Sequence, residues 1–392
     1  MFTLVENESS AKIMVIGVGG AGGNAINNMI DSKLKGVKFI AANTDSQALE
    51  ISKASVRMQI GEKLTQGLGA GADPQIGREA ALENSEAIKN MFEGSHMVFI
   101  TAGFGGGTGT GAAPIIAEIC KEIDALTVAV VTKPFSFEGN KRAKQAEEGI
   151  NSLKKVADTV ITIPNDRLRG LASKNAKMTD MFKKADEILL HSVKGITDLI
   201  MMPGLINLDF ADVRTIMSKA GMAIMGIGIS SGENRALEAA ERAISHPLLE
   251  DISISGAKGV LMNITSNSDL TMEEMAEASD RIYNEVGENA DIIWGTVVDN
   301  TLGDEMRVTV IATGLNSGPE SEMENELRGK IRDVTFNDFN DAVDYDEPTF
   351  IRRKEAVGES SGATYRGYRG IVIDNNDLND LDVPTFLRKK AD

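Results

Sequence analysis

The run from Gly103 to Gly111, which reads Gly-Phe-Gly-Gly-Gly-Thr-Gly-Thr-Gly, restricts the fold of this chain more than any other feature. Apolar residues 96–102 precede it and predict a strand. Residues 112–126 carry apolar side chains at helical spacing, with Pro114 suited to a first turn. Glycine lets backbone N–H groups approach an anion closely, and the start of a helix adds partial positive charge. This strand, loop and helix therefore predict a phosphate group as the ligand.

Two other interpretations of the glycine run fit its surroundings less well. A flexible linker does not usually connect an apolar strand to an amphipathic helix. A Walker-type loop requires Gly-Lys-Ser or Gly-Lys-Thr at its end, and neither triplet occurs in the chain.

A second glycine-rich loop lies near the start of the chain. Residues 12–16 predict a buried strand, residues 17–24 form the loop, and a helix is expected to begin at Ala25. Another apolar strand, 37–42, runs toward Asp45. Strand, loop, helix and strand in this order make the unit of a parallel α/β sheet.

The early loop taken alone leaves an alternative open. Gly17, Gly19 and Gly22 fit the pattern G-x-G-x-x-G, and Asp45 follows at about the distance at which a dinucleotide-binding fold places its ribose acid. An NAD(P)-dependent oxidoreductase on a Rossmann fold is therefore the competing hypothesis. Two anion-binding loops at the ends of parallel strands favour a nucleoside triphosphate over one pyrophosphate.

Charge and composition limit the possible partners. The formal net charge of -17 repels nucleic acid and anionic lipid, so we expect phosphate binding to be local and built from backbone amides. No apolar run is long enough for a membrane span and the start lacks a secretory pattern, so we expect a cytoplasmic protein with no direct membrane insertion. The single cysteine, Cys120, is expected to be a packed thiol, and the scattered histidines predict no protein-held metal site.

The apolar pattern along the chain predicts an α/β protein with two domains. Strands are expected at 126–132, 159–163, 259–265, 291–298 and 306–313, and Thr271 with Glu274 predicts a capping box for a helix over 271–286. The expected organisation is a flexible N-terminus (1–10), a Rossmann-like parallel-sheet domain (11–178), a long central helix (179–202), a loop and following helix (203–221), a smaller α/β domain (222–315) and a mostly disordered acidic tail (316–392).

The acidic tail contains two near-copies of one short peptide, at 344–354 and 380–390. Each copy has an acidic residue, Pro and Thr, then Phe with Ile or Leu, then a basic end. Such a peptide can dock its apolar pair in a groove of a partner protein. A chance repeat in a biased tail is the alternative.

Five separated motifs together resemble the tubulin/FtsZ family of GTPases across nearly the whole ordered part of the chain. The run Gly105–Gly111 is similar to the signature of that family, and the other four motifs follow in the family's order: Gly19–Asn24, Thr132–Gly139, Ile163–Asp166 and Asn207–Arg214. The resemblance implies a GTP-binding domain over 11–178, a long central helix, and a second domain that supplies catalytic residues to the neighbouring subunit of a filament.

The resemblance also implies roles for individual residues of this chain. The phosphates would lie on Gly20, Ala21, Gly22, Gly23 and Asn24 and on Gly107, Thr108 and Gly109. Glu138 and Arg142 would contact the ribose and phosphate region, Phe182 would stack on guanine, and Asn165 and Asp186 would read its edge.

Asp186 is the residue that we expect to set base specificity. A carboxylate can accept hydrogen bonds from both N–H donors of guanine, whereas adenine would leave it facing an unpaired acceptor. A solvated charge on the central helix is the alternative for Asp186.

The loop at Asn207–Asp212 is implied to be the catalytic element. Asp209 and Asp212 would polarise and orient the attacking water, with Asn207 beside them, over the GTP of the next subunit. From the residues alone, one of these carboxylates could simply cap the helix that begins there. Mg²⁺ would be held mainly by the nucleotide phosphates.

The implied function is GTP-dependent head-to-tail polymerisation into the filaments of a bacterial division ring, beneath the inner membrane at mid-cell. The tail peptides are similar to a recognition peptide that binds an FtsA-like membrane-tethering adaptor, although one copy is expected and two are present. The second copy would add avidity or be inert. A GTP-binding scaffold without hydrolysis is a further alternative, which the intact pair Asp209 and Asp212 disfavours.

Overall fold

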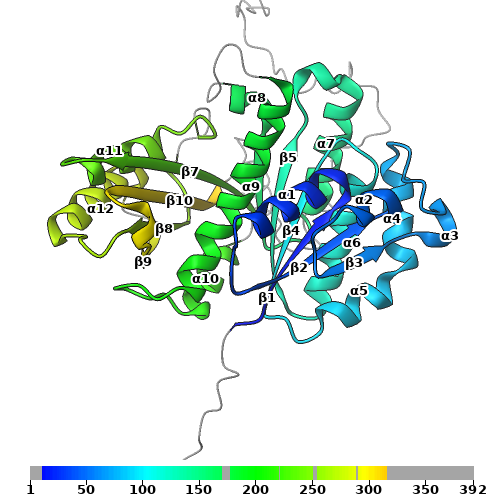
Figure 1. Ribbon diagram of the computed structural model, residues 1–392, viewed down its shortest axis with the longest axis horizontal. Helices are drawn as coiled ribbons and strands as arrows, with labels where there is room; N and C mark the ends of the chain where they lie inside the picture. The colour runs from blue at the N-terminus through cyan, green and yellow to red at the C-terminus, as the bar shows by residue number, and fades with distance from the viewer. Residues whose placement is uncertain (1–10, 170–176, 220, 250–253, 288–289, 316–392) are drawn as a thin grey trace, which may run out of the picture. The chain divides into compact units, whose positions relative to one another are not determined.

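The computed structural model describes residues 11–169, 177–219, 221–249, 254–287 and 290–315, and the predictions for residues 1–10 and for the tail from 316 lie outside these ranges. Figure 1 shows the described helices and strands. None of the described helices has the length and apolar character needed to cross a membrane.

The described strands form one ten-stranded sheet in the order β3-β2-β1-β4-β5-β6-β7-β10-β8-β9. All pairs from β3 to β7 are parallel, β10 is antiparallel to β7 and β8, and β8 is parallel to β9. The order of the first six strands is that of a Rossmann-like sheet, so the predicted α/β fold class is confirmed. The strands are β1 (Ile13–Val18), β2 (Val37–Asn43), β3 (Val56–Gln59), β4 (Met97–Gly103), β5 (Leu126–Lys133), β6 (Thr159–Pro164), β7 (Gly221–Ser231), β8 (Gly259–Ser266), β9 (Asp291–Val298) and β10 (Glu305–Leu315).

Helices cover both faces of the sheet because its central strands are apolar on both faces. Side chains of β1 alternate between two cores, with Val15 in the one that contains α1 and α9 and Ile16 in the one that contains α4, α5, α6 and α7. The helices are α1 (Gly19–Asp31), α2 (Ser46–Glu50), α3 (Glu62–Thr65), α4 (Pro74–Glu83), α5 (Ser85–Phe92), α6 (Thr108–Glu122), α7 (Asn140–Leu153), α8 (Asn165–Leu168), α9 (Met178–Met201), α10 (Phe210–Met217), α11 (Arg235–Ile244) and α12 (Met272–Val286), with short 3-10 turns η1 (Ser136–Glu138) and η3 (Asn300–Leu302).

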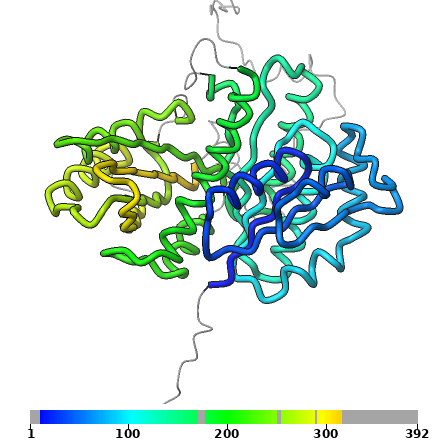
Figure 2. The backbone as a smooth tube through the Cα atoms, viewed as in Figure 1, coloured from blue at the N-terminus to red at the C-terminus, as the bar shows by residue number. Residues whose placement is uncertain are grey.

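The long helix α9 connects the two parts of the sheet. Its apolar side chains share one core with β1 and β4 and with Leu261 and Ile311 of β8 and β10. Asn263 Nδ2 donates to the backbone oxygen of Gly195 at 2.9 Å, where both groups are buried. Figure 2 shows α9 and α10, in green, between the blue and cyan segment and the yellow segment. A third core lies under α11 and α12.

Both glycine-rich helices begin earlier than the sequence predicts. Helix α1 begins at Gly19 rather than Ala25, and α6 begins at Thr108 rather than near Ala112. The first turns are therefore built from glycine and threonine, whose low helix propensity conceals them in the sequence. Pro114 was predicted to lie in the first turn of this helix. Because α6 begins earlier, Pro114 lies inside the helix, and that prediction is wrong. The helix ends at Glu122, and the strand that begins at Leu126 is β5.

Cys120 is fully buried on the apolar side of α6, as predicted. Burial raises the pKa of its thiol to about 12, because the charged thiolate would lose its hydration there.

Two neighbouring glycines of α1 give a matched test of how this helix packs on the sheet. A Cβ on Gly22 would lie 2.5 Å from the backbone oxygen of Thr101, whereas a Cβ on Gly23 would meet nothing within 4 Å. We expect Gly22→Ala to lower the free energy of unfolding by about 1–3 kcal/mol through overpacking. Gly23→Ala should raise it by about 0.5–1 kcal/mol through better helix propensity. Urea denaturation of the nucleotide-free protein measures both changes, and equal effects would contradict this packing.

Candidate nucleotide-binding site

A cavity of about 350 Å³ lies where β1 and β4 end and α1 and α6 begin. The strand order reverses between these neighbouring strands, and α1 and α6 pack on opposite faces of the sheet. Such a switch point is where open parallel sheets bind ligands. The lining residues are Gly19, Gly20, Ala21, Asn24, Gly103, Phe104, Gly106, Gly107, Thr108, Gly109, Thr132, Pro134, Glu138, Arg142, Asn165, Phe182, Ala185, Asp186 and Leu189.

The glycines of this cavity serve two different purposes. A Cβ on Gly20 or Gly106 would meet no atom within 4 Å, so their exposed backbone faces open space in which a ligand fits. A Cβ on Gly109 would lie 2.6 Å from the backbone oxygen of Gly103, and one on Gly107 would meet Ala70 at 2.8 Å. These two glycines therefore let the surrounding backbone close around the start of α6. The free N–H groups of two helix starts point to an anion site.

Two hydroxyl groups order the loop that precedes α6. Thr110 Oγ1 accepts a hydrogen bond from the backbone N–H of Gly105 at 2.9 Å. Thr108 Oγ1 lies 2.7 Å from Thr44 Oγ1, and Thr108 also lines the cavity. The loop is thus held in one conformation by side chains within and beside it.

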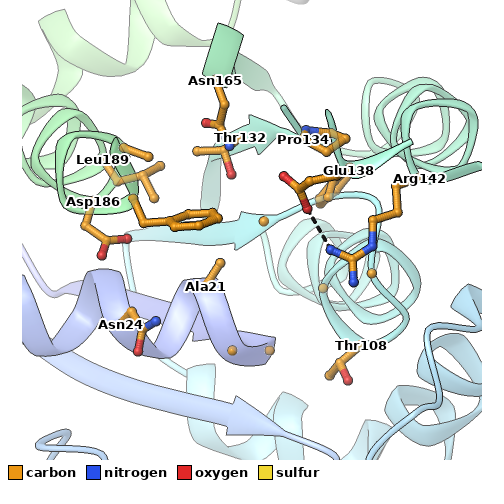
Figure 3. A pocket seen from close by; sticks show the side chains of 18 of the residues that line it. Ala21, Asn24, Thr108, Thr132, Pro134, Glu138, Arg142, Asn165, Asp186 and Leu189 are labelled. Carbon is orange, nitrogen blue, oxygen red and sulfur yellow. Dashed lines mark hydrogen bonds and ion pairs between the residues drawn. The ribbon is translucent and has the colours of Figure 1, made fainter. Parts of the chain in front are cut away.

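Arg142 supplies a positive charge to the lining through an ion pair with Glu138. Arg142 Nη1 lies 2.6 Å from Glu138 Oε2, and the other carboxylate oxygen, Oε1, accepts from the backbone N–H of Phe135 at 2.9 Å (Figure 3). Glu138 is therefore fixed on both oxygens, while half of the Arg142 side chain stays exposed. This pair can contact the sugar and phosphates of a nucleotide.

The opposite side of the cavity carries groups suited to a base. Figure 3 shows Asp186 across the pocket from Thr108 and Arg142. Burial, with a smaller contribution from Glu187, raises the pKa of the Asp186 carboxyl to about 6. Asn165 Oδ1 is buried and has no hydrogen-bond partner among the described residues. Phe182 is 41% exposed and meets Phe135 edge to face, with ring centroids 5.5 Å apart.

These base-side groups fit a planar ligand. An exposed aromatic face offers stacking, and a half-buried carboxyl and a buried unpaired amide oxygen both gain stability from N–H donors. Guanine carries two such donors on one edge. The donor and acceptor set is therefore compatible with guanine at one end and phosphates at the other.

Most of the predicted binding residues come together in this cavity. Its lining includes Gly20, Ala21, Asn24, Gly107, Thr108, Gly109, Glu138, Arg142, Asn165, Phe182 and Asp186. Gly22 and Gly23 lie outside the lining: Gly22 packs against Thr101, and Gly23 borders a smaller neighbouring cavity.

The predicted catalytic residues lie outside the lining. Asp209 is the N-cap of α10, where its Oδ1 accepts from Asp212 N at 2.8 Å, and Asp212 Oδ2 accepts from Asp209 N at 3.3 Å. Asn207 Oδ1 accepts from the backbone N–H of Gly204 at 2.7 Å. The capping role considered from the sequence is therefore present.

Several lining residues were missed by the sequence reasoning. Ala185 and Leu189 stand three and seven positions after Phe182 on α9, so helical spacing from Phe182 and Asp186 could have found them. The others sit inside or beside quoted motifs and could have been found as their neighbours: Gly19, Gly103, Phe104, Gly106, Thr132 and Pro134.

Two glycine-lined helix starts, a fixed ion pair and a base-sized polar face define a nucleotide-binding α/β protein. The comparisons give its family. Residues 12–173 match the GTPase domain of the Tubulin/FtsZ family, and residues 221–316 match the C-terminal domain of the FtsZ family. The chain belongs to the FtsZ branch of this GTPase family.

Individual relatives agree with that assignment. The chain is 52% identical over 356 residues to the cell division protein FtsZ of Coxiella burnetii, covering 91% of this chain and 92% of the relative. An FtsZ dimer from M. jannaschii has 48% identity and a TM-score of 0.75, covering 79% of this chain and 89% of that chain. CetZ2 from Haloferax volcanii, a GTPγS-bound protofilament, has 20% identity and a TM-score of 0.68, covering 81% and 98%, and shows the shared fold.

Family membership makes the chain a tubulin-like, self-polymerising GTPase of cell division that binds GTP or GDP. The oxidoreductase and the scaffold without hydrolysis are not supported. Asp45, which the oxidoreductase hypothesis needs at a ribose, instead caps α2 by accepting from Gln47 N and Ala48 N.

The raised pKa of Asp186 predicts a pH dependence of nucleotide binding. If Asp186 pairs with guanine N–H groups, the carboxylate is the form that accepts from both, and affinity should fall as the pH drops through about 6, by up to about tenfold per pH unit. Isothermal titration with GDP between pH 7.5 and 5.0 measures this.

Asp186→Asn is the control, because the GDP phosphates also titrate near pH 6 in both proteins. The variant should bind GDP more weakly at pH 7.5. Its affinity should then fall less between pH 7.5 and 5.0 than that of the unsubstituted protein, because only the phosphates still titrate. Parallel pH profiles for the two proteins would exclude Asp186 as the titrating group.

Proposed function

We propose that GTP is bound in this cavity and hydrolysed at the contact between two copies of the chain in a head-to-tail filament. The distribution of carboxylates supports this. Of the two that line the cavity, Glu138 is held by Arg142 and Asp186 lies at the far, base-reading side. The exposed Asp209 and the half-buried Asp212 lie outside the lining, so in our proposal a neighbouring copy brings such a pair to the phosphates.

The roles proposed within the cavity follow from the positions of its groups. The N–H groups at Gly20, Ala21 and Asn24 and at Gly107–Gly109 bind phosphate oxygens, and Arg142 adds positive charge. Phe182 stacks on the base, and Asn165 and Asp186 pair with its edge. Stabilising the charge of the transferred phosphoryl group is the main catalytic requirement in such reactions.

Mg²⁺ fits this site as an ion held on the nucleotide. Among the described residues, no three His, Cys, Asp or Glu side chains gather as a ligand set. The Thr108 hydroxyl in the lining is a neutral oxygen of the kind that Mg²⁺ tolerates beside phosphates. When bound, the ion would neutralise phosphate charge, while the residues of this chain orient the nucleotide.

The loop that precedes α10 is ordered by hydrogen bonds of its own side chains, which supports a role for it in hydrolysis. The reciprocal hydrogen bonds of Asp209 and Asp212 fix both side chains at the start of the helix, and Asn207 closes the turn before them. A head-to-tail contact is heterologous and need not close, so one kind of subunit can extend an open filament. In our proposal the two carboxylates orient the water that attacks the neighbour's GTP.

Asp212→Asn tests the catalytic part of this proposal. Asparagine can still accept the capping hydrogen bond from Asp209 N, so α10 should remain folded, but the charge is lost. We expect normal GTP affinity and a loss of about 10²–10⁴-fold in turnover. Phosphate release, measured over a series of protein concentrations, should rise per subunit with concentration only in the unsubstituted protein.

A mixing experiment separates the two surfaces of the contact. Asp212→Asn keeps an intact cavity, whereas Asp186→Ala keeps an intact catalytic loop. An equimolar mixture should hydrolyse GTP faster than the sum of the two proteins alone. No gain in the mixture, or full turnover by Asp212→Asn, would contradict a catalytic loop supplied by a neighbour.

We further propose that the tail peptides at 344–354 and 380–390 bind an FtsA-like membrane-tethering adaptor. The near-repetition of their sequence supports a shared partner. An adaptor of this kind would hold the filaments in the cytoplasm beneath the inner membrane at the division site. The adaptor is needed because the net charge of -17 repels the chain itself from anionic lipid.

Separate deletion of each tail peptide tests whether both copies are used. Two sites on one chain raise affinity for a clustered adaptor by about 10²-fold or more. Deleting either copy should then reduce retention on adaptor-coated vesicles. An unchanged affinity after deletion of 344–354 would show that this copy is inert.

A further inference from the structure

Thr44 is a fully buried residue that directly follows β2, and it lies outside the cavity lining. Its Oγ1 is 2.7 Å from Thr108 Oγ1, which is a short and well-formed hydrogen bond between hydroxyls. In the part of the chain that the structure describes, Thr108 is the hydrogen-bonding partner of this hydroxyl. The contact therefore links a buried residue to the lining of the phosphate-binding side.

The direction of this hydrogen bond becomes fixed when an anion binds. Each threonine hydroxyl has one proton to donate, whereas ionised phosphate oxygens only accept. If Thr108 donates its proton to a phosphate, the contact with Thr44 can persist only when the Thr44 hydroxyl donates to Thr108. The two hydroxyls then form a chain that runs from Thr44 through Thr108 to the ligand.

We propose that Thr44 is a positioning residue for phosphate binding, acting through the Thr108 hydroxyl. This inference rests on the proposed function, which places phosphates on Gly107–Gly109. Donation from Thr44 holds Thr108 in one rotamer and polarises its O–H bond, since hydrogen bonds in a chain strengthen one another. Without that donor, Thr108 would have to be ordered by the ligand alone.

The backbone around Thr44 keeps its hydroxyl in place. The carbonyl oxygen of Thr44 accepts from Thr65 Oγ1 at 3.1 Å and from the backbone N–H of Gly69 at 3.2 Å. The segment that contains Thr65 and Gly69 thus fixes the backbone of Thr44. The positioning group is preorganised before any ligand enters.

Two conservative variants separate the hydroxyl from the shape of Thr44. Thr44→Val keeps the shape but removes the donor, and Thr44→Ser keeps the donor but removes the methyl group. The full-length proteins are titrated with GTP, GDP and guanosine, which lacks phosphates. We expect Thr44→Val to lower the affinity for GTP and for GDP by about 3- to 10-fold and to leave the affinity for guanosine unchanged. Thr44→Ser should bind all three ligands with normal affinity.

A reference variant, Thr108→Val, keeps this test separate from the proposed site. Normal GTP and GDP binding by Thr44→Val, together with weakened binding by Thr108→Val, would overturn the role of Thr44 alone. If Thr44→Val lowered the affinity for guanosine as much as that for GTP, or if Thr44→Ser bound as weakly as Thr44→Val, the effect of Thr44 would come from its packing and not from its hydroxyl hydrogen bond. Unchanged GTP and GDP binding by Thr108→Val would show that the Thr108 hydroxyl does not contact a phosphate, and would overturn the proposed chain from Thr44 while leaving phosphate binding by the backbone N–H groups of Gly107–Gly109 in place.

Discussion

The close approach of two helix starts is the constraint on which this structure depends. A Cβ on Gly19 would lie 3.1 Å from the backbone nitrogen of Gly109, so α1 and α6 begin almost in contact although they cover opposite faces of the sheet. Their unpaired N–H groups then converge on one cavity. A chain with net charge -17 can bind a polyanion there because the attraction comes from oriented backbone and not from its overall charge.

The second structural element that matters for function is α9. One face of this helix supplies Phe182, Asp186 and their neighbours to the base side of the cavity. Farther along, its apolar residues share a core with β8 and β10, and Asn263 donates to Gly195. A ligand at the base side therefore contacts the same helix that packs against β8 and β10. In the sequence, α9 leads directly into the loop before α10.

Hydrogen bonds between residues close together in the sequence were predictable, whereas packing between distant segments was not. The capping box of Thr271 and Glu274 is confirmed, because its two hydrogen bonds involve residues three positions apart. The early starts of α1 and α6 were missed because glycine is a poor helix former, and burial against the sheet stabilises these turns instead. Pairing of β6 with β7, which joins both parts in one sheet, leaves no local signal. The burial that raises the pKa of Asp186 likewise comes from distant contacts.

The buried state of Cys120 has a practical consequence. It is the single cysteine of the chain, and its thiol is both shielded from solvent and held in the protonated form that does not react with alkylating reagents. A cysteine introduced at an exposed position such as Leu68 would therefore be the one site that a maleimide dye labels in the folded protein. Fluorescent reporters can be attached without first removing the native sulfur.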